Sequence, residues 1–130
     1  MIGDACHPTL PHLAQGAAQA IEDAAVISVV LSRLPDSNPE SVKKALRVYE
    51  ALRKERAETM VELAAENGRA LHLGEGAAKE ERDRQFAALK ASAKGTVPDK
   101  WADAEVQKRI YGHDCIRIAE DSFDDLYAKV

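Results

Sequence analysis

The chain has 130 residues, a net charge of −4 and 45% hydrophobic residues, which is the size and composition of one small globular domain. Only 5% of the residues are aromatic, so the core must be built mainly from small side chains that each bury little area. The acidic balance argues against binding to nucleic acid or to an anionic membrane, because no basic patch would neutralise phosphate. No uncharged apolar run could span a bilayer and no basic-led signal segment is present, so we expect a cytoplasmic protein.

The first 25 residues are the most specific stretch, and they predict a strand end, a tight loop and then a buried helix. Gly3-Asp4 places a carboxylate after an apolar lead-in, and Pro8 and Pro11 stiffen the loop that follows. The small residues of Ala14-Gln15-Gly16-Ala17 open the helix, where a ligand could touch the backbone. Free N–H groups at a helix start attract electron-rich ligand atoms. The stretch therefore predicts a ligand-binding loop.

The rest of the chain is predicted to be helical. Residues 15–34 are apolar on nearly every side, which indicates a buried helix that needs neighbours on several faces. Asn38 can cap and Pro39 can begin a long amphipathic helix that continues to Gly68. Further helical segments are predicted over residues 75–94, 101–110 and 115–129, with Asp99 capping the second of them and Trp101 anchoring it on the preceding helices.

Charged residues cover one face of the long helix: Lys43, Lys44, Arg47, Glu50, Arg53, Lys54, Glu55, Arg56 and Glu58. A basic helix of this kind is sometimes a partner-binding or nucleic-acid-binding element. Because acids are interleaved with the bases, we favour a solvated face.

Two cysteines and the early histidines are the candidates for thiol or metal chemistry. Cys6 and Cys115 lie far apart in sequence and are predicted to be free thiols. A nucleophilic pair of Cys6 and His7 is the less favoured interpretation, since sequence neighbours point apart in an extended segment and no orienting acid is evident. We expect Cys6 to be a small buried thiol. His7 and His12 lack a third and fourth ligand at matching spacing, so we predict no metal site and expect histidines bonded to the backbone.

Two acidic motifs have a possible catalytic role. Glu22 and Asp23 interrupt the apolar helix, and His113-Asp114 precedes the last helix. Adjacent helical residues project about 100° apart, so structural bonding to neighbouring loops is the favoured role of the first pair. An Asp cap of the last helix explains the second motif without chemistry.

The first stretch resembles the Gly-Asp fingerprint of the FAD-dependent aromatic hydroxylases, the class A flavoprotein monooxygenases, and most closely their salicylate-hydroxylase-like branch. The matching residues are Gly3, Asp4, Ala5, His7, Pro8, Pro11, Gln15, Gly16, Glu22, Asp23 and Ala24. Tyr111-Gly112-His113-Asp114 is similar to the tail of the same branch.

The resemblance implies a role for six residues in binding FAD. By resemblance, Gly3 and Asp4 form the fingerprint, and Asp4 bonds the ribitol. Pro11 is expected beside the isoalloxazine, and the N–H groups of Gln15, Gly16 and Ala17 are expected to face the flavin N1/O2 edge.

The sequence departs from the family pattern in two places. Ala14 stands where many members have Gly, which is tolerated if the backbone has negative φ. Ala18 stands where many have Asn, which removes a polar side chain near the flavin.

The resemblance implies two regions: residues 1–34 as part of an FAD-binding domain, and residues 35–130 as a C-terminal helical region. No strand followed by Gly-x-Gly-x-x-Gly is present to hold the ADP half of FAD. We therefore expect a mainly α, C-terminal fragment of an α/β monooxygenase that is inactive alone, where the complete enzyme would use NAD(P)H and an aromatic substrate. The alternatives are a helical partner subunit that binds a separately encoded flavin domain through residues 17–31, and a truncated reading frame.

Overall fold

The computed structural model describes residues 1–92 and 95–130. Its elements are two 3-10 helices, η1 (Gly3–Ala5) and η2 (Pro11–Leu13), and five α-helices, α1 (Gly16–Ser32), α2 (Pro39–Leu71), α3 (Ala77–Ser92), α4 (Ala104–Tyr111) and α5 (Cys115–Tyr127). The described residues contain no strand, and the mainly α prediction is confirmed. The predicted third helix ran through Ala93 and Lys94, which lie outside the described residues.

The expected strand end at the start of the chain is extended backbone without a partner strand. Ile2 has φ −137° and ψ 162°, and η1 begins at the next residue. A β-strand needs a neighbouring strand to pair its backbone groups. The described residues offer none, so the apolar lead-in forms no sheet.

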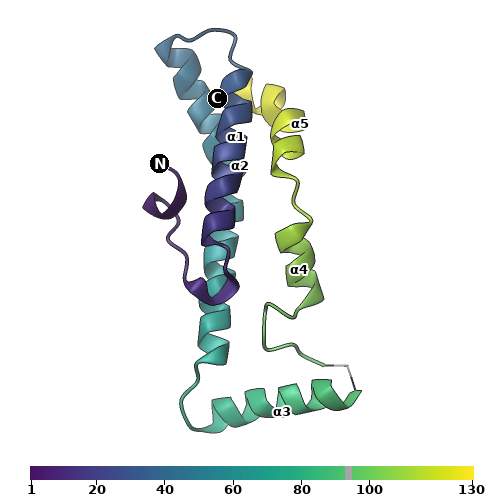
Figure 1. Cartoon of the computed structure of the whole chain (residues 1–130). Helices are drawn as coiled ribbons and strands as arrows, with labels where there is room; N and C mark the ends of the chain where they lie inside the picture. Colours follow the sequence, from purple (N-terminus) through teal and green to yellow (C-terminus); the bar gives the residue numbers. More distant parts are fainter. Residues whose placement is uncertain (93–94) are drawn as a thin grey trace.

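Three helices form the main bundle. α1 packs against α2 and α5, and α2 also contacts α5. Figure 1 shows α1 lying along α2, with α5 and α4 on one side of the pair and α3 crossing beyond the end of α2. η1 packs on α1 and η2 packs on α2, so both 3-10 helices of the N-terminal loop rest on this bundle.

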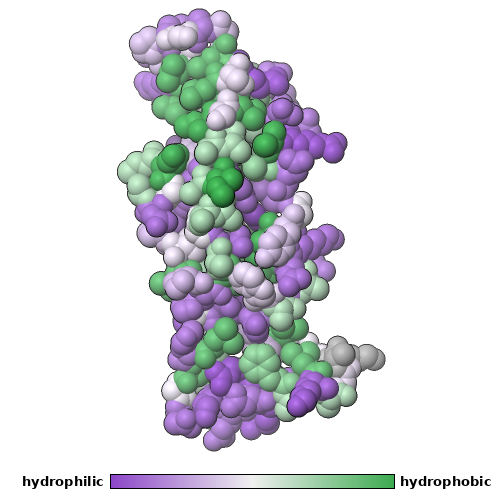
Figure 2. Space-filling model, in the orientation of Figure 1, coloured by the Kyte–Doolittle hydropathy of each residue, from purple (hydrophilic) through white to green (hydrophobic). Residues whose placement is uncertain are grey.

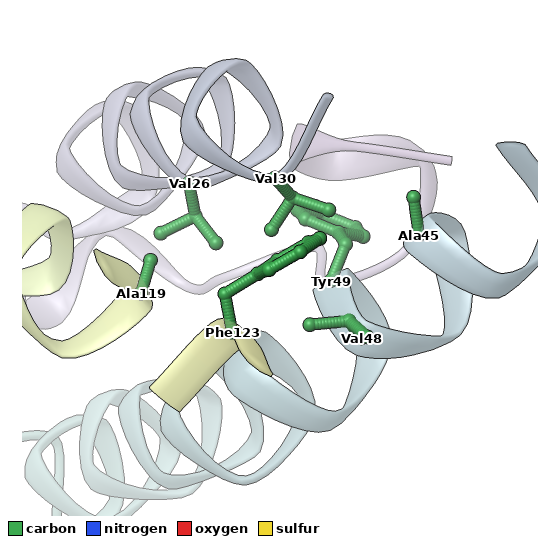
Figure 3. Packing of buried hydrophobic residues seen from close by; sticks show 7 residues of the cluster. All are labelled: Val26, Val30, Ala45, Val48, Tyr49, Ala119 and Phe123. Carbon is green, nitrogen blue, oxygen red and sulfur yellow. The ribbon is translucent and has the colours of Figure 1, made fainter. Parts of the chain in front are cut away.

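The hydrophobic core is thin and lies where α1, α2 and α5 meet (Figure 3). Its buried members are Val26, Val30, Ala45, Val48, Tyr49, Ala119 and Phe123. Phe123 is 3% exposed and stacks on the Tyr127 ring at 5.2 Å between centroids. Since the other members are Val or Ala, the two aromatic side chains, Tyr49 and Phe123, supply much of the buried apolar area.

Side-chain caps begin the helices largely where the sequence predicts them. Asn38 caps α2, and Asp114 accepts a hydrogen bond from the Arg117 N–H at the start of α5. The predicted start of α4 is wrong by three residues, since the helix begins at Ala104 rather than at Trp101. Its cap is Asp103 rather than Asp99. Asp99 instead accepts a hydrogen bond from the Trp101 N–H in a turn before the helix.

Trp101 does not anchor the tail, because its side chain is 41% exposed. The contact to α2 comes from the backbone beside it, where the Lys100 N–H donates to the Asn67 side chain at 2.8 Å.

α3 is held mainly by a polar contact. None of its described residues is buried. The Arg82 guanidinium donates to the carbonyl oxygens of Ala70 and Leu71 at the end of α2, at 3.4 and 3.1 Å. These carbonyls have no partner within the helix, so Arg82 caps α2 while it fixes the start of α3.

One face of α1 has no neighbour among the described residues. Five of its exposed residues recur at spacings of three and four and are here called the α1 stripe: Ala17, Ile21, Ala24, Ser28 and Leu31. Ile21 is 70% exposed, and Figure 2 shows hydrophobic side chains gathered on the face of the molecule to which α1 belongs. A large exposed apolar patch marks an interaction surface. The helix predicted to need neighbours on several faces therefore lacks one on this face among the described residues.

None of the helices in the described residues is long and apolar enough to cross a membrane.

Substitution of the two phenylalanines tests which packing stabilises the fold. Phe123→Ala is expected to lower the free energy of unfolding by about 3 kcal/mol or more, because it leaves a cavity in the core. Phe86→Ala is the matched control: Phe86 is 38% exposed on α3, and its loss is expected to cost about 0.5 kcal/mol. Urea unfolding followed by circular dichroism measures both, and equal losses would contradict this description of the core.

Candidate functional site

The buried carboxylate of Asp23 joins the N-terminal loop to α1 and α2. Its Oδ2 accepts the Gly3 N–H at 2.9 Å and lies 2.6 Å from His7 Nε2, and its Oδ1 accepts from Arg53 Nε at 2.8 Å. Burial alone would raise the pKa of Asp23, but the Gly3 N–H, Arg53 and His7 lower this pKa to about 2. Asp23 is therefore a structural anion, which agrees with the favoured prediction.

The same network includes Glu22, the neighbour of Asp23 on α1. Arg53 Nη1 donates to Glu22 Oε2 at 2.5 Å, and Arg53 Nη2 donates to Gln19 Oε1 at 2.8 Å. Arg56 Nη2 donates to Glu22 Oε1 at 2.9 Å. Both guanidinium groups lower the pKa of Glu22 although its partial burial opposes them.

The prediction of a solvated face is wrong for Arg53 and Arg56, which are 3% and 9% exposed. They lie three residues apart, so they share one face of α2, and this face packs on α1. Arg56 also donates to the carbonyl oxygens of Arg109 and Ile110, at 2.6 and 2.9 Å. Arg56 thus caps the end of α4 and ties it to the network.

The network holds the turn that presents Asp4. Gly3 is buried with φ +59°, a backbone conformation that residues other than Gly rarely adopt. The next side chain, Asp4, is exposed, and its Oδ1 is 4.0 Å from the point that a Cβ on Gly16 would occupy. The structure therefore brings Asp4 to the start of α1, where the positive end of the helix dipole lies.

The other predicted FAD contacts surround this helix start. Pro11 begins η2 and is exposed. Gln15 is buried and donates to the Leu13 carbonyl at 3.2 Å, and it precedes α1 without a side-chain cap. Gly16 is half-buried and Ala17 is exposed. The first N–H groups of α1 are thus not capped by the Gln15 side chain.

Ala14 has a left-handed backbone, with φ 49° and ψ 30°. The condition under which Ala would be tolerated here, a negative φ, is therefore not met. The chain must turn sharply between η2 and α1, and the left-handed conformation makes that turn. For a residue with a Cβ the left-handed conformation costs about 1–2 kcal/mol, so Ala14 is strained where Gly would not be.

Asn67 and Gly68 of α2 contact His12 in the second half of the N-terminal loop. Asn67 is 1% exposed and donates to the His12 carbonyl at 3.0 Å. A Cβ on Gly68 would lie 2.3 Å from His12 Cδ2, so only glycine lets the ring approach the helix. The sequence pattern indicates only a helix end at Asn67 and Gly68, because their contacts are to His12, which lies 55 positions before Asn67.

Two expectations about the thiol and imidazole are wrong. Cys6 is exposed rather than buried, and His7 bonds the Asp23 carboxylate rather than the backbone. Both result from η1, which bends the chain so that the two residues do not follow an extended path. The structure brings Cys6, His7 and Asp23 to one wall of a cavity of about 500 Å³.

A second cavity, of about 840 Å³, lies between α2 and the segment around α4, with Arg56 and His113 in its wall. Burial, followed by the charge of Arg56, lowers the pKa of His113. Asp114 does not pair with this ring and caps α5 instead. The role favoured for Asp114 is confirmed.

Ala14→Gly is expected to stabilise the chain by about 1 kcal/mol, because it relieves the left-handed strain although Gly has more freedom in the unfolded chain. Ala24→Gly, at an exposed interior position of α1, is the control and is expected to destabilise by about 1 kcal/mol. Chemical unfolding measures both. Destabilisation by Ala14→Gly would contradict the left-handed turn.

Asp23→Asn is expected to destabilise the chain by about 3 kcal/mol or more at pH 7, because it leaves Arg53 buried without its charged partner. The folded pKa of about 2 lies below the ordinary value of 3.8. The stabilisation from Asp23 is therefore complete above pH 4 and is lost as the pH falls towards 2. The difference in unfolding free energy between wild type and variant should shrink over this range.

Asp121→Asn is the control for this experiment, since Asp121 and its partner Arg117 are both more than 70% exposed. Its effect should stay below about 1 kcal/mol. If Asp23→Asn costs no more than this control at pH 7, the central position of Asp23 is refuted.

Comparison with known proteins gives relatives but no matching family model. The chain is 32% identical over 122 residues to the FAD-dependent monooxygenase OpS4 of Beauveria bassiana (strain ARSEF 2860), covering 94% of this chain and 28% of the relative. It is 38% identical over 88 residues to the 3-amino-4-hydroxybenzoate 2-monooxygenase of Streptomyces cremeus, covering 68% and 21%. It is 45% identical over 67 residues to the 6-hydroxynicotinate 3-monooxygenase of Pseudomonas fluorescens, covering 52% and 17%.

The chain thus spans between about a sixth and somewhat more than a quarter of the length of these relatives. Such shares are consistent with the expected placement in the C-terminal part of a longer fold. The names of the relatives also support FAD as the cofactor of this group. The chain is therefore a homologue of part of the class A FAD-dependent monooxygenases, the family that its first residues resemble.

Proposed function

We propose that residues 3–17 form one wall of an FAD site in an aromatic-ring hydroxylase. The observation that carries the proposal is the position of Asp4, an exposed carboxylate held beside the start of α1 by a buried network. A carboxylate beside free N–H groups suits a ligand that carries hydroxyl donors next to an electron-rich ring edge. FAD has both, in its ribitol and in its flavin N1/O2 edge.

The described residues fit half of the cofactor. Asp4 is free to accept from ribitol hydroxyls, and the N–H groups of Gly16 and Ala17 would face the flavin edge, with Pro11 beside the ring. Gly16 suits this position because a larger side chain would stand next to the Asp4 carboxylate. Within the described residues no glycine-rich turn follows a strand to bind the ADP half, and we propose that the remaining walls come from other polypeptide.

When bound, FAD would supply the redox chemistry, with NAD(P)H as the reductant of the complete enzyme. The residues of this chain would bind and orient the cofactor. The substrate class that we propose is a hydroxylated aromatic acid such as salicylate. Two relatives are named for acids of this kind, 3-amino-4-hydroxybenzoate and 6-hydroxynicotinate.

A second candidate function is that of a partner subunit for a separately encoded flavin domain. The α1 stripe favours it, because an exposed apolar face that includes Ile21, 70% exposed, marks an interaction surface. We propose as occupant the part of the monooxygenase fold that the relatives possess beyond the matched length. In a single longer chain the same stripe would be an internal contact.

A chimera tests the proposed site. This chain replaces the segment with which it aligns over 122 residues in the Beauveria bassiana relative, and bound flavin is measured by absorbance after gel filtration. The chimera is expected to retain FAD, whereas the isolated chain is expected to bind FAD weakly or not at all. Asp4→Ala in the chimera should weaken FAD binding at least tenfold, because a charge-assisted hydrogen bond contributes about 1.5–3 kcal/mol.

The control is Asp36→Ala, which removes an exposed carboxylate from the α1–α2 loop and should leave FAD binding unchanged. Equal FAD affinity in the Asp4 and Asp36 variants would remove the basis of the proposal. To separate the two candidate functions, the isolated chain is mixed with the relative's remaining segment. Flavin binding that is restored, and then lost with Ile21→Lys, would support the partner subunit; no association would exclude it.

A further inference from the structure

A thiol, an imidazole and a carboxylate meet at the edge of the N-terminal turn, outside the proposed flavin contacts. Cys6 Sγ, a ring nitrogen of His7 and a carboxylate oxygen of Asp23 lie within 4.8 Å of one another. Cys6 is exposed and not in a disulfide, and its thiol donates to the Gly3 carbonyl at 3.4 Å. A thiol with one weak bond is free to rotate towards a neighbouring group.

The hydrogen bonds of Asp23 determine which nitrogen of His7 is available. The carboxylate is ionised, since it already accepts from the Gly3 N–H and from Arg53. The 2.6 Å contact to His7 Nε2 therefore places a proton on Nε2, which donates to Asp23. In neutral imidazole the other nitrogen then carries the lone pair. His7 Nδ1 is this acceptor.

His7 Nδ1 has no hydrogen-bond partner within the described part of the chain, although the His7 side chain is only 8% exposed. Buried polar atoms are normally paired, and an exception needs an explanation. The orphaned atom belongs to the side chain next to Cys6, and both residues line the cavity of about 500 Å³. Neither this nitrogen nor the weakly bonded Cys6 thiol has another strong partner among the described residues, and a thiol that rotates to an unpaired base becomes a nucleophile.

The cavity has room for a small reactant next to the thiol. Its remaining wall combines apolar residues with four charged ones, Glu50, Arg53, Lys54 and Glu58. Because charges of both signs are present, the wall favours neither an anion nor a cation strongly.

A metal ion is the less suitable ligand for this cluster. The Asp23 oxygens already accept from three donors. Sγ and Nδ1 are then the two donor atoms left among the described members of the cluster, fewer than the three or four that protein zinc sites use.

We propose that Cys6 is a reactive thiol that exchanges with low-molecular-weight disulfides, with His7 as its base and Asp23 as a positioning residue. His7 Nδ1 accepts the proton of Cys6 Sγ, and the thiolate attacks one sulfur of the disulfide. The Cys6 S–S bond forms as the S–S bond of the reactant breaks. Cys6 is oxidised, the leaving sulfur is reduced, and the proton passes from His7 to the departing thiolate.

The full chain contains its own control thiol. Cys115 on α5 is half-buried, and burial raises the pKa of its thiol. The chain is treated with dithiodipyridine, a neutral disulfide, and mass spectrometry of peptides measures the rate at each cysteine in the folded chain and in urea. Cys6 should react at least tenfold faster folded than unfolded, and Cys115 should react more slowly folded. A folded Cys6 that is no faster than unfolded Cys6 would overturn the proposal.

His7→Ala tests the base. The rate at Cys6 should fall at least tenfold, in the lower range of general-base effects, and added imidazole should restore part of it, while Cys115 stays unchanged. An unchanged Cys6 rate, or a loss that imidazole does not restore, would overturn the role of His7. Circular dichroism checks that the variant is folded; if it is not, the folded-to-unfolded ratio in the wild-type chain still decides the proposal.

Discussion

The structure depends on one buried negative charge, the carboxylate of Asp23. Removing an ion from water costs several kcal/mol unless other groups replace its hydration. Here the Gly3 N–H, His7 and Arg53 replace it, and they come from the loop and from α2. Loss of any of these hydrogen bonds would leave the buried charge less well compensated, at a cost in free energy. The loop and the two helices are therefore fixed relative to one another.

The hydrogen bonds to Asp23 hold the N-terminal loop in its conformation. Gly3 and Ala14 both adopt positive φ, the first with a residue suited to it and the second with strain. Backbone strain persists where the surroundings over-determine a conformation, and here the buried network and the Asn67 contact to His12 do so. The result is a rigid platform that leaves Asp4 free at the start of α1.

The exposed face of α1 is apolar, in contrast to the buried face of the same helix, which carries the charged network. The core is thin, yet Ile21 and Leu31 remain outside it. Polar residues do not break the α1 stripe except for Ser28. Since the chain spans only part of its relatives, a surface of this kind agrees with a segment whose apolar area is shared with further polypeptide.

Local signals determined much of this protein from the sequence alone. Helical periodicity and caps such as Asn38 and Asp114 located the helices to within a few residues, and the Gly-Asp fingerprint indicated the family. These features depend on residues close in sequence, where propensity and capping act. What only the tertiary structure decided are pairings between distant residues.

Arg53 has the same local context as the solvated charges around it, and nothing within α2 distinguishes it. Its burial arises because Asp23, 30 residues earlier, lies opposite it. The same carboxylate bonds His7, 16 residues before it, and leaves His7 Nδ1 without a partner among the described residues. The sequence therefore determined which helices form and which family they resemble. The packing of α1 on α2 decided which charges are buried, because an ion pair exists only when both partners have been placed.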